Sequence, residues 1–318
     1  MMRTWALAAL IGVGATACGE PKSDDDDEQT ETTETEDSAT EPDAVWSEHR
    51  VETPSTFTGV YASGGGVYVA GSGGEIWVGG SDDDWARIEV DLEENDIGGL
   101  WGSGVGESVE LVAVASTGII GHLAGGTWTS TDTGTANHEG VHGSASNRIY
   151  AVSWGGIYLY DGNSWTYEPV PADARLNAVY AVGEQAMAVG EDGVALMREA
   201  GVWTEVDTGY NGDLRGVHGV TMDDVWAVGE TGTALHWDGA SWTPGDTGIT
   251  YDISACFAAS SNVVYAVGNN GVALRWDGSV WTDLPTGVTN NLYAIHGVSG
   301  SNVWAVGNKG MALQFKDD

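Results

Sequence analysis

The stretch VWAVGETGTALHWDGASW at residues 225–242 returns 39 residues further along the chain as VYAVGNNGVALRWDGSVW at residues 264–281. The tryptophan that ends each copy belongs to a series with spacings of 37 to 43 residues, which comprises Trp46, Trp85, Trp128, Trp165, Trp203, Trp242 and Trp281. Seven units of about 39 residues therefore fill the region 46–318. A repeat of this length, built from short apolar segments separated by glycine, is typical of the blades of a β-propeller.

Each unit divides into four short strands. In the fifth unit we expect them at 214–220, 225–229, 233–237 and 241–244. A G-x-x-G turn joins the second strand to the third, and Asp-Gly joins the third to the fourth, which supplies the positive φ that tight hairpins need. The connections are too short for crossover helices. The pattern predicts an all-β fold, a seven-bladed β-propeller of four-stranded antiparallel blades.

The first strand of each unit shows four consecutive columns that are small, branched apolar, aromatic or histidine, and small again. Because the innermost strands of a propeller crowd its axis, small side chains let the seven backbones approach one another. We therefore expect this strand to line the central channel. Cys256 stands in the branched apolar column, which indicates a core thiol. The third column consists of Tyr61, Trp101, His142, Tyr180, His218, Phe257 and His296.

The last unit stops after MALQFKDD and lacks a fourth strand. The segment AVWSEHRV at 44–51 aligns with fourth-strand segments such as ASWTPGDT and GVWTEVDT. We expect this N-terminal segment to complete the seventh blade, which closes the ring and removes exposed sheet edges.

The N-terminus carries the features of a targeting segment. Arg3 precedes the apolar run 5–15, which is too short to span a bilayer but suits the core of a signal peptide. The segment resembles a bacterial lipoprotein signal, with the lipobox Ala15-Thr16-Ala17-Cys18, although leucine is usual where Ala15 stands. The resemblance implies removal of the signal peptide 1–17, lipidation of Cys18 with a palmitate-type chain, and anchoring in the cell envelope, with Gly19 favouring the outer membrane.

Residues 18–44 separate this signal from the repeats. Twelve acids and one lysine lie in 19–44, with no apolar residue beyond alanine. Such a segment is unable to bury surface, so we expect a disordered, self-repelling acidic tether before a propeller domain at 45–318.

The charge of the chain restricts its partners. The net charge is −36, from 47 acidic and 11 basic residues. A surface of this sign repels phosphate backbones and anionic lipid headgroups, which argues against nucleic acid and leaves the lipid anchor as the only membrane contact. We expect a monomer without a cofactor, whose partner is an extracytoplasmic protein or a glycan.

The repeat V-W-A-V-G-x-x-G-x-A-L-x-W-D-G-x-x-W-T resembles the BNR or Asp-box propellers of bacteria, which include sialidases and photosystem II stability factors. The likeness runs from Trp46 to the C-terminus. It departs from the Asp-box order S-x-D-x-G-x-x-W, because Asp238 is followed directly by Gly239 and His236 stands in place of the serine. The resemblance implies a propeller. It leaves three functions open, which are a non-catalytic binding platform, a sialidase-like glycoside hydrolase and an assembly factor of the envelope or photosystem type.

Two sets of side chains are candidates for function. His142, His218 and His296 share one column in alternate blades and could bind a metal, although inter-blade packing explains them as well. We expect no metal and no catalytic residue. Off-register aromatic residues and polar turn residues should lie together on the face that carries the loops between the second and third strands and between blades. The binding-face candidates are Trp154, Glu191, Asp192, Tyr210, Asn211, Glu230, Asn269, Asn270, Asn290 and Lys309.

Overall fold

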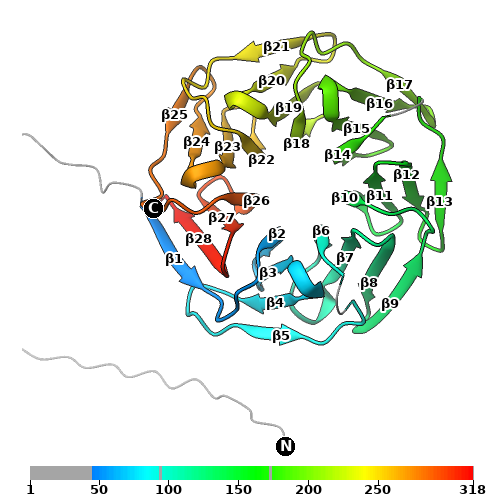
Figure 1. Ribbon diagram of the computed structural model, residues 1–318, viewed down its shortest axis with the longest axis vertical. Coiled ribbons are helices and arrows are strands. Elements are labelled where there is room, and N and C mark those ends of the chain that lie inside the picture. Colours follow the sequence, from blue (N-terminus) through cyan, green and yellow to red (C-terminus); the bar gives the residue numbers. More distant parts are fainter. Residues whose placement is uncertain (1–44, 93–94, 172–173, 318) are drawn as a thin grey trace, which may run out of the picture. The chain divides into compact units, whose positions relative to one another are not determined.

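The computed structural model describes residues 45–92, 95–171 and 174–317, so Cys18 and the expected tether lie outside the described residues. In the described part of the chain, 28 strands form seven four-stranded antiparallel sheets. The sheets stand around a central channel like the blades of a propeller (Figure 1). The predicted fold class is thereby confirmed.

We name the strands of each blade A to D from the channel outward. The A strands of blades 1 to 7 are β2 (Phe57–Ser63), β6 (Ile97–Ser103), β10 (His138–Ala145), β14 (Leu176–Val182), β18 (Leu214–Thr221), β22 (Ile253–Ser260) and β26 (Leu292–Ser299). The B strands are β3 (Gly66–Gly71), β7 (Glu110–Ala115), β11 (Arg148–Ser153), β15 (Gln185–Gly190), β19 (Asp224–Gly229), β23 (Val263–Gly268) and β27 (Asn302–Gly307).

The outer strands follow in the same order. The C strands are β4 (Ile76–Gly79), β8 (Ile119–Ala124), β12 (Gly156–Tyr160), β16 (Ala195–Glu199), β20 (Ala234–Trp237), β24 (Ala273–Trp276) and β28 (Met311–Lys316). The D strands are β5 (Ala86–Ile88), β9 (Thr127–Asp132), β13 (Trp165–Glu168), β17 (Val202–Glu205), β21 (Trp242–Gly245), β25 (Trp281–Asp283) and, for blade 7, β1 (Trp46–Arg50). Short 3₁₀ turns are η1 (Ser72–Gly74), η2 (Gly106–Ser108), η3 (Glu191–Gly193), η4 (Glu230–Gly232) and η5 (Asn269–Gly271).

The small residues of strand A are required by the crowding around the channel. A Cβ added to Gly59 would lie 2.6 Å from the Cβ of Leu100 in the next blade, and one added to Gly216 would lie 2.8 Å from the Cα of Ala255. Since real Cβ atoms do not approach other carbons this closely, a larger residue here would force neighbouring blades apart. The steric contact thus explains the small column of the sequence.

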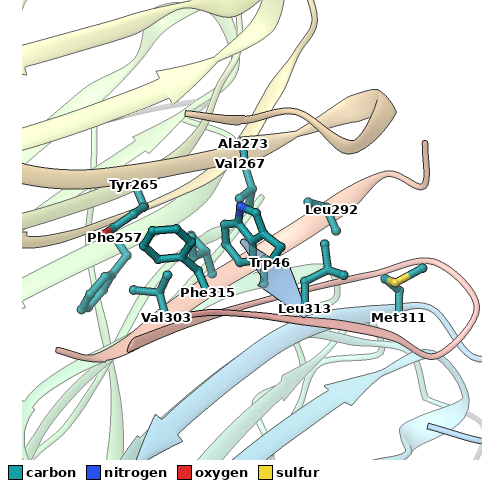
Figure 2. Packing of buried hydrophobic residues seen from close by; sticks show 12 residues of the cluster. Trp46, Phe257, Tyr265, Val267, Ala273, Leu292, Val303, Met311, Leu313 and Phe315 are labelled. Atoms are coloured by element: carbon teal, nitrogen blue, oxygen red, sulfur yellow. The ribbon is translucent and has the colours of Figure 1, made fainter. Parts of the chain in front are cut away.

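The hydrophobic core lies between adjacent blades rather than within them. Each core cluster combines the facing sides of neighbouring sheets, as in the set that joins blades 6 and 7. Figure 2 shows this set, in which Trp46 and Phe315 of blade 7 face Phe257 and Tyr265 of blade 6. Cys256, the expected core thiol, is buried among the residues between blades 5 and 6, and burial raises its pKa to about 12.

The N-terminal strand closes the ring, as the sequence predicts. Strand β1 pairs antiparallel with β28, with Trp46 opposite Phe315 and Arg50 opposite Met311. In Figure 1 the first coloured strand lies beside the last one. The first and last described strands therefore share one sheet, and the outer edge of β28 is paired. Within the described residues, no helix is long and apolar enough to cross a bilayer.

Replacing Trp46 by alanine should destabilise the whole ring, because Trp46 anchors the closing strand and is 6% exposed. We expect Trp46→Ala to lower the free energy of unfolding by about 3–5 kcal/mol, the range for a large aromatic residue removed from a core. Urea unfolding followed by tryptophan fluorescence measures the change. The neighbouring Val45, 65% exposed, supplies the control Val45→Ala. Equal stability losses in the two variants would contradict closure by this strand.

Candidate functional site at the channel mouth

One position of strand A breaks the repeat, and it does so in every blade. It lies between a buried residue such as Leu214 and the small column that contains Gly216, and its residue type differs in all seven blades. The seven residues are Thr58, Gly98, Glu139, Asn177, Arg215, Ser254 and Tyr293. They line one mouth of the central channel together with Glu191 and Asp213, around a depression of about 320 Å³. We call the seven strand-A residues the mouth residues.

A β-bulge places each mouth residue. In blade 5 the pairing of strands A and B passes from Leu214–Gly229 directly to Gly216–Val228, so that Arg215 has no partner in the ladder. The same register shift occurs at this position in the other six blades. A bulge re-aims the side chain of the extra residue and frees it from the packing of the sheet. The mouth residues are therefore free to differ while the residues on either side repeat.

The charges of the mouth are unevenly compensated. The Arg215 guanidinium lies 3.1 Å from Glu230 and 3.2 Å from Asp252, so two carboxylates share one cation. Glu139 has no cation within ion-pair distance among the described residues. Burial and the neighbouring Glu191 raise the pKa of its carboxyl group. The mouth thus has an excess of negative charge next to a half-buried carboxylate.

Trp154 extends the mouth outward over blades 3 and 4. It lies in the B–C turn of blade 3, where its ring is 41% exposed. The Arg175 guanidinium lies 5.0 Å from the centre of the Trp154 ring and pairs with Glu191 at 3.3 Å. A cation held over an aromatic face restrains the ring in its exposed position. Trp154, Arg175 and Glu191 therefore connect the rim of the molecule with the channel mouth.

The other predicted face residues are distributed over the turns around this mouth. Glu191, Glu230 and Asn269 each begin a 3₁₀ turn between strands B and C. Asp192 and Asn270 follow in two of these turns, and Lys309 lies in the B–C turn of blade 7; their φ angles are 55°, 60° and 60°, and their side chains are exposed. Asn211 is exposed in the loop before blade 5, whereas Asn290 donates a hydrogen bond to the Asn308 carbonyl at 3.4 Å.

Tyr210, another of the binding-face candidates, is only partly exposed. Its ring is partly buried against the core of blades 4 and 5, and its hydroxyl donates to the Glu230 carbonyl at 3.2 Å. It therefore holds the loop before blade 5 against the B–C turn. Its contribution to binding remains a prediction, and Trp154 is the more accessible of the two aromatic residues.

None of the seven mouth residues is among the sequence-based binding-face candidates. The sequence-based candidates are turn residues and off-register aromatic residues, because the prediction for strand A rests on the residue types that recur in it. These positions could have been found from a column with seven different residue types that lies between two uniform columns. Such divergence is visible in the alignment of the seven units, but the bulge that gives it meaning appears only in the structure.

The three channel histidines bind backbone rather than one another. The Nδ1 atoms of His142, His218 and His296 each accept a hydrogen bond of 3.1 Å from a backbone N–H of the next blade, at Ala181, Ala258 and Ala62 respectively. The acceptor role of Nδ1 places the proton of the neutral ring on Nε2. These histidines therefore satisfy N–H groups of the innermost strands, which have no further strand to pair with.

Their environment keeps the imidazoles neutral. Burial, reinforced by the nearby His296, lowers the pKa of His142 to about 3, and burial lowers that of His296 to about 4. The pKa of His218 also lies well below its ordinary value, because of burial and the two other histidines. Among the described residues, no group of three His, Cys, Asp or Glu side chains could hold a metal ion.

The arginine side chains that could bind a carboxylate substrate in a sialidase-like enzyme lie in different blades. Arg50, Arg148 and Arg198 pair with Glu48, Glu184 and Glu168 respectively, in blades 7, 3 and 4. Arg175 and Arg215 lie at the mouth but are each engaged by carboxylates. A carboxylate clamp needs guanidinium groups that converge on one point. These five arginines do not form such a set.

Comparisons with known proteins identify similar folds. No family model and no curated protein matches the chain. Among solved structures, YCF48 bound to D1 peptide aligns over 86% of this chain and 97% of its own, at 17% identity and a TM-score of 0.69. YCF48 from Cyanidioschyzon merolae aligns over 86% and 99% at 16% identity and a TM-score of 0.68. A streptogramin B lyase aligns over 85% and 97% at 13% identity and a TM-score of 0.74. At these identities the likeness shows the propeller fold alone.

The channel histidines should make the fold sensitive to acid. Their pKa values in the folded chain lie below the ordinary value of 6.5, so between pH 6.5 and about 4 the unfolded chain binds more protons. Stability is then complete above pH 6.5 and falls as the pH decreases. We expect the triple variant His142→Phe/His218→Phe/His296→Phe to lose less stability over this interval, since Phe257 already occupies the same column in blade 6. Urea unfolding at pH 7.5, 5.5 and 4.5 tests this. Parallel pH profiles for the two proteins would disprove the assignment.

Proposed function

We propose that this protein is a lipid-anchored propeller of the bacterial cell envelope that binds another protein through the face around the channel mouth. The observation that supports the proposal most directly is the set of seven mouth residues, which differ in every blade and stand on bulges. A rigid ring whose A strands repeat on either side of these seven positions presents a defined, non-symmetric surface there. Binding residues are commonly held in this way by a rigid scaffold.

The exposed aromatic ring at the edge of this face suits a protein partner. Trp154 is a large side chain that is already restrained by Arg175, so little conformational entropy is lost when a partner covers it. A propeller of the same fold, YCF48, is known with a D1 peptide bound. By analogy, an extended segment of a partner protein is the ligand that we propose for this mouth.

The charge of the mouth selects among such segments. Glu139 is half-buried without a cation, and Glu191 and Asp213 line the same depression. Glu230 and Asp252 share the single guanidinium of Arg215, so they leave the mouth with an excess of carboxylates. Electrostatic complementarity favours a partner segment that carries lysine or arginine. The acidic residues 19–44 have the same sign as the mouth, so they are a poor competitor for it.

The anchor rests on the sequence alone. The lipobox at 15–18 places Cys18 at the start of the mature chain, followed by the acidic residues 19–44. A segment of this length is long enough to separate a membrane anchor from a folded domain by tens of ångströms. We propose that the lipid at Cys18 holds the propeller at the outer membrane while the mouth remains accessible.

Photocrosslinking in intact cells tests the binding face. A photoreactive phenylalanine analogue in place of Trp154 should yield a discrete covalent adduct with a partner protein. The same analogue in place of Val298, which is 43% exposed near the far end of strand A in blade 7, should not. Glu139→Gln in the Trp154 reporter should lower the yield by about tenfold, less than the loss for a fully buried charge pair because Glu139 is only half-buried.

The matched control is Glu107→Gln, which makes the same change on the exposed A–B turn of blade 2, at the other end of the channel. Equal adducts from the Trp154 and Val298 reporters would reject the mouth as the binding face. Adducts that are insensitive to Glu139→Gln would retain the face but reject a cationic segment.

Lipidation is tested separately. In cells fed an alkyne-labelled palmitate, the wild-type protein should incorporate the label and sediment with the outer membrane. Cys18→Ser should lose both properties, because the thiol that receives the lipid is absent, whereas Cys256→Ser should keep them. Labelling that persists in Cys18→Ser would show that the lipid is attached elsewhere, and a wild-type protein without label would contradict lipidation altogether.

A further inference from the structure

A second site emerges from the junctions between blades. The third residue after the repeated tryptophan of strand D points toward the next blade, and it carries a side chain in six of the seven blades. The residues are His49, Ile88, Thr131, Glu168, Val206, Gly245 and Leu284. Only in blade 5 is this position a glycine. The junction of blades 5 and 6 therefore lacks a side chain that every other junction has.

Ile88, Val206 and Leu284 pack against the cores between blades, and the junction of blades 3 and 4 shows a polar way to fill the same position. Glu168 accepts hydrogen bonds from Arg198 at 2.6 and 2.8 Å and from the indole N–H of Trp203 at 2.8 Å. Both donors belong to blade 4. The Glu168 carboxylate thus fills the space between the outer strands of two blades and pairs the polar groups there.

At the junction of blades 5 and 6 the equivalent residues are different. Gly245 replaces Glu168, and Trp276 and Trp281 occupy the columns of Arg198 and Trp203. A hollow of about 450 Å³ opens here, lined by Pro244, Gly245, Asp246, Thr247, Gly248, Trp276, Ser279, Val280 and Trp281. A Cβ at Gly245 would lie 3.1 Å from the indole nitrogen of Trp281, so the missing side chain would cover this ring.

The floor of the hollow is a tryptophan cluster with an unused donor. The rings of Trp276 and Trp281 lie 5.0 and 5.1 Å from that of Trp226. Trp281 is 7% exposed, and its N–H has no acceptor among the described residues. The same holds for Trp46, Trp85, Trp226, Trp237 and Trp242, whereas the Trp203 N–H is paired, so the hollow differs from the other junctions in its missing side chain rather than in this donor. A buried N–H without an acceptor is unfavourable, and a ligand oxygen that reached it after a small shift of Gly245 would remove that penalty.

The rim adds polar groups to this apolar floor. Asp246 uses one carboxylate oxygen to accept from the Gly248 N–H, and its other oxygen forms no hydrogen bond with the described residues. The Ser279 hydroxyl donates to Asp277, which leaves its oxygen as an acceptor. Pro244 and Val280 form apolar walls, and Val280 is 52% exposed. The hollow therefore combines flat aromatic surface with a few directed polar groups, as small-molecule sites do.

We propose that this hollow binds one residue of a neutral carbohydrate. A pyranose ring has an apolar C–H face that stacks on an indole and hydroxyl groups that both donate and accept at its edge. An apolar protein side chain would leave Asp246 and the Trp281 N–H without partners. An acidic sugar would meet the Asp246 carboxylate on a chain of net charge −36, so the sugar is neutral. The site lies on the flank of blades 5 and 6, apart from the mouth residues, and does not depend on the proposed protein partner.

The test uses defined oligosaccharides and residues borrowed from the junction of blades 3 and 4. Cellotetraose, maltotetraose, mannotetraose and tetra-N-acetylchitotetraose are titrated into the propeller and followed by tryptophan fluorescence and calorimetry, with sialyllactose as the acidic comparison. We expect at least one neutral tetrasaccharide to bind with a Kd of about 1 mM or below. Gly245→Glu and Trp276→Arg, which introduce the residue types of Glu168 and Arg198, should each weaken binding by about tenfold or more.

The matched control is Gly64→Glu, because an added Cβ at Gly64 meets no atom within 4 Å and the charge change is the same. This variant should bind like the wild type, and urea midpoints should show that all variants are folded. Absence of binding by every neutral sugar up to about 10 mM, or binding that survives both junction substitutions, would overturn the proposal. Sialyllactose binding as tightly as the neutral sugars would overturn the assignment of a neutral ligand.

Discussion

The pairing of β1 with β28 is the interaction on which the rest of the structure depends. A ring of blades has no end only if its first and last strands meet in one sheet, and here the two ends of the repeat region do so from Trp46 to Arg50. Because the core lies between blades, each blade buries its two faces only when both neighbours are present. Closure therefore stabilises all seven junctions, and the geometry of the channel mouth follows from it. An open ring would leave two unpaired faces and an exposed edge.

Much of this architecture was predictable because closure and crowding impose the same demand on every blade. Gly59 and Gly216 must be small for the same steric reason. A small residue therefore recurs at this position in every repeat and can be recognised from the sequence. The strands expected in blade 5 agree with β18 to β21 within about two residues at each end, and the closing role of Trp46 is confirmed. Even the placement of Cys256 in the core followed from its column.

The candidate site was less predictable because it depends on where side chains point. The bulge at Arg215 is a feature of the hydrogen-bond ladder that no residue type predicts. The sequence also does not predict that the Tyr210 side chain turns inward toward Glu230. Likewise, the three histidines of the channel have a shared explanation in backbone N–H groups of the next blade, which is a relation between blades rather than within one repeat. The repeat pattern predicts structural features that all seven units share. It does not predict contacts that form between only one pair of units.

The two proposed sites arise from departures of different kinds. At the mouth, the bulged residues lie outside the ladder, so Glu139 and Arg215 can differ from their counterparts with little effect on the sheet. At the junction of blades 5 and 6, Gly245 removes a side chain from a position that packs between blades, and an unfilled space there weakens the contact. The first kind of departure is compatible with any surface role. The second lowers stability unless something occupies the hollow, and the tryptophans beneath it are a surface that a sugar ring would cover.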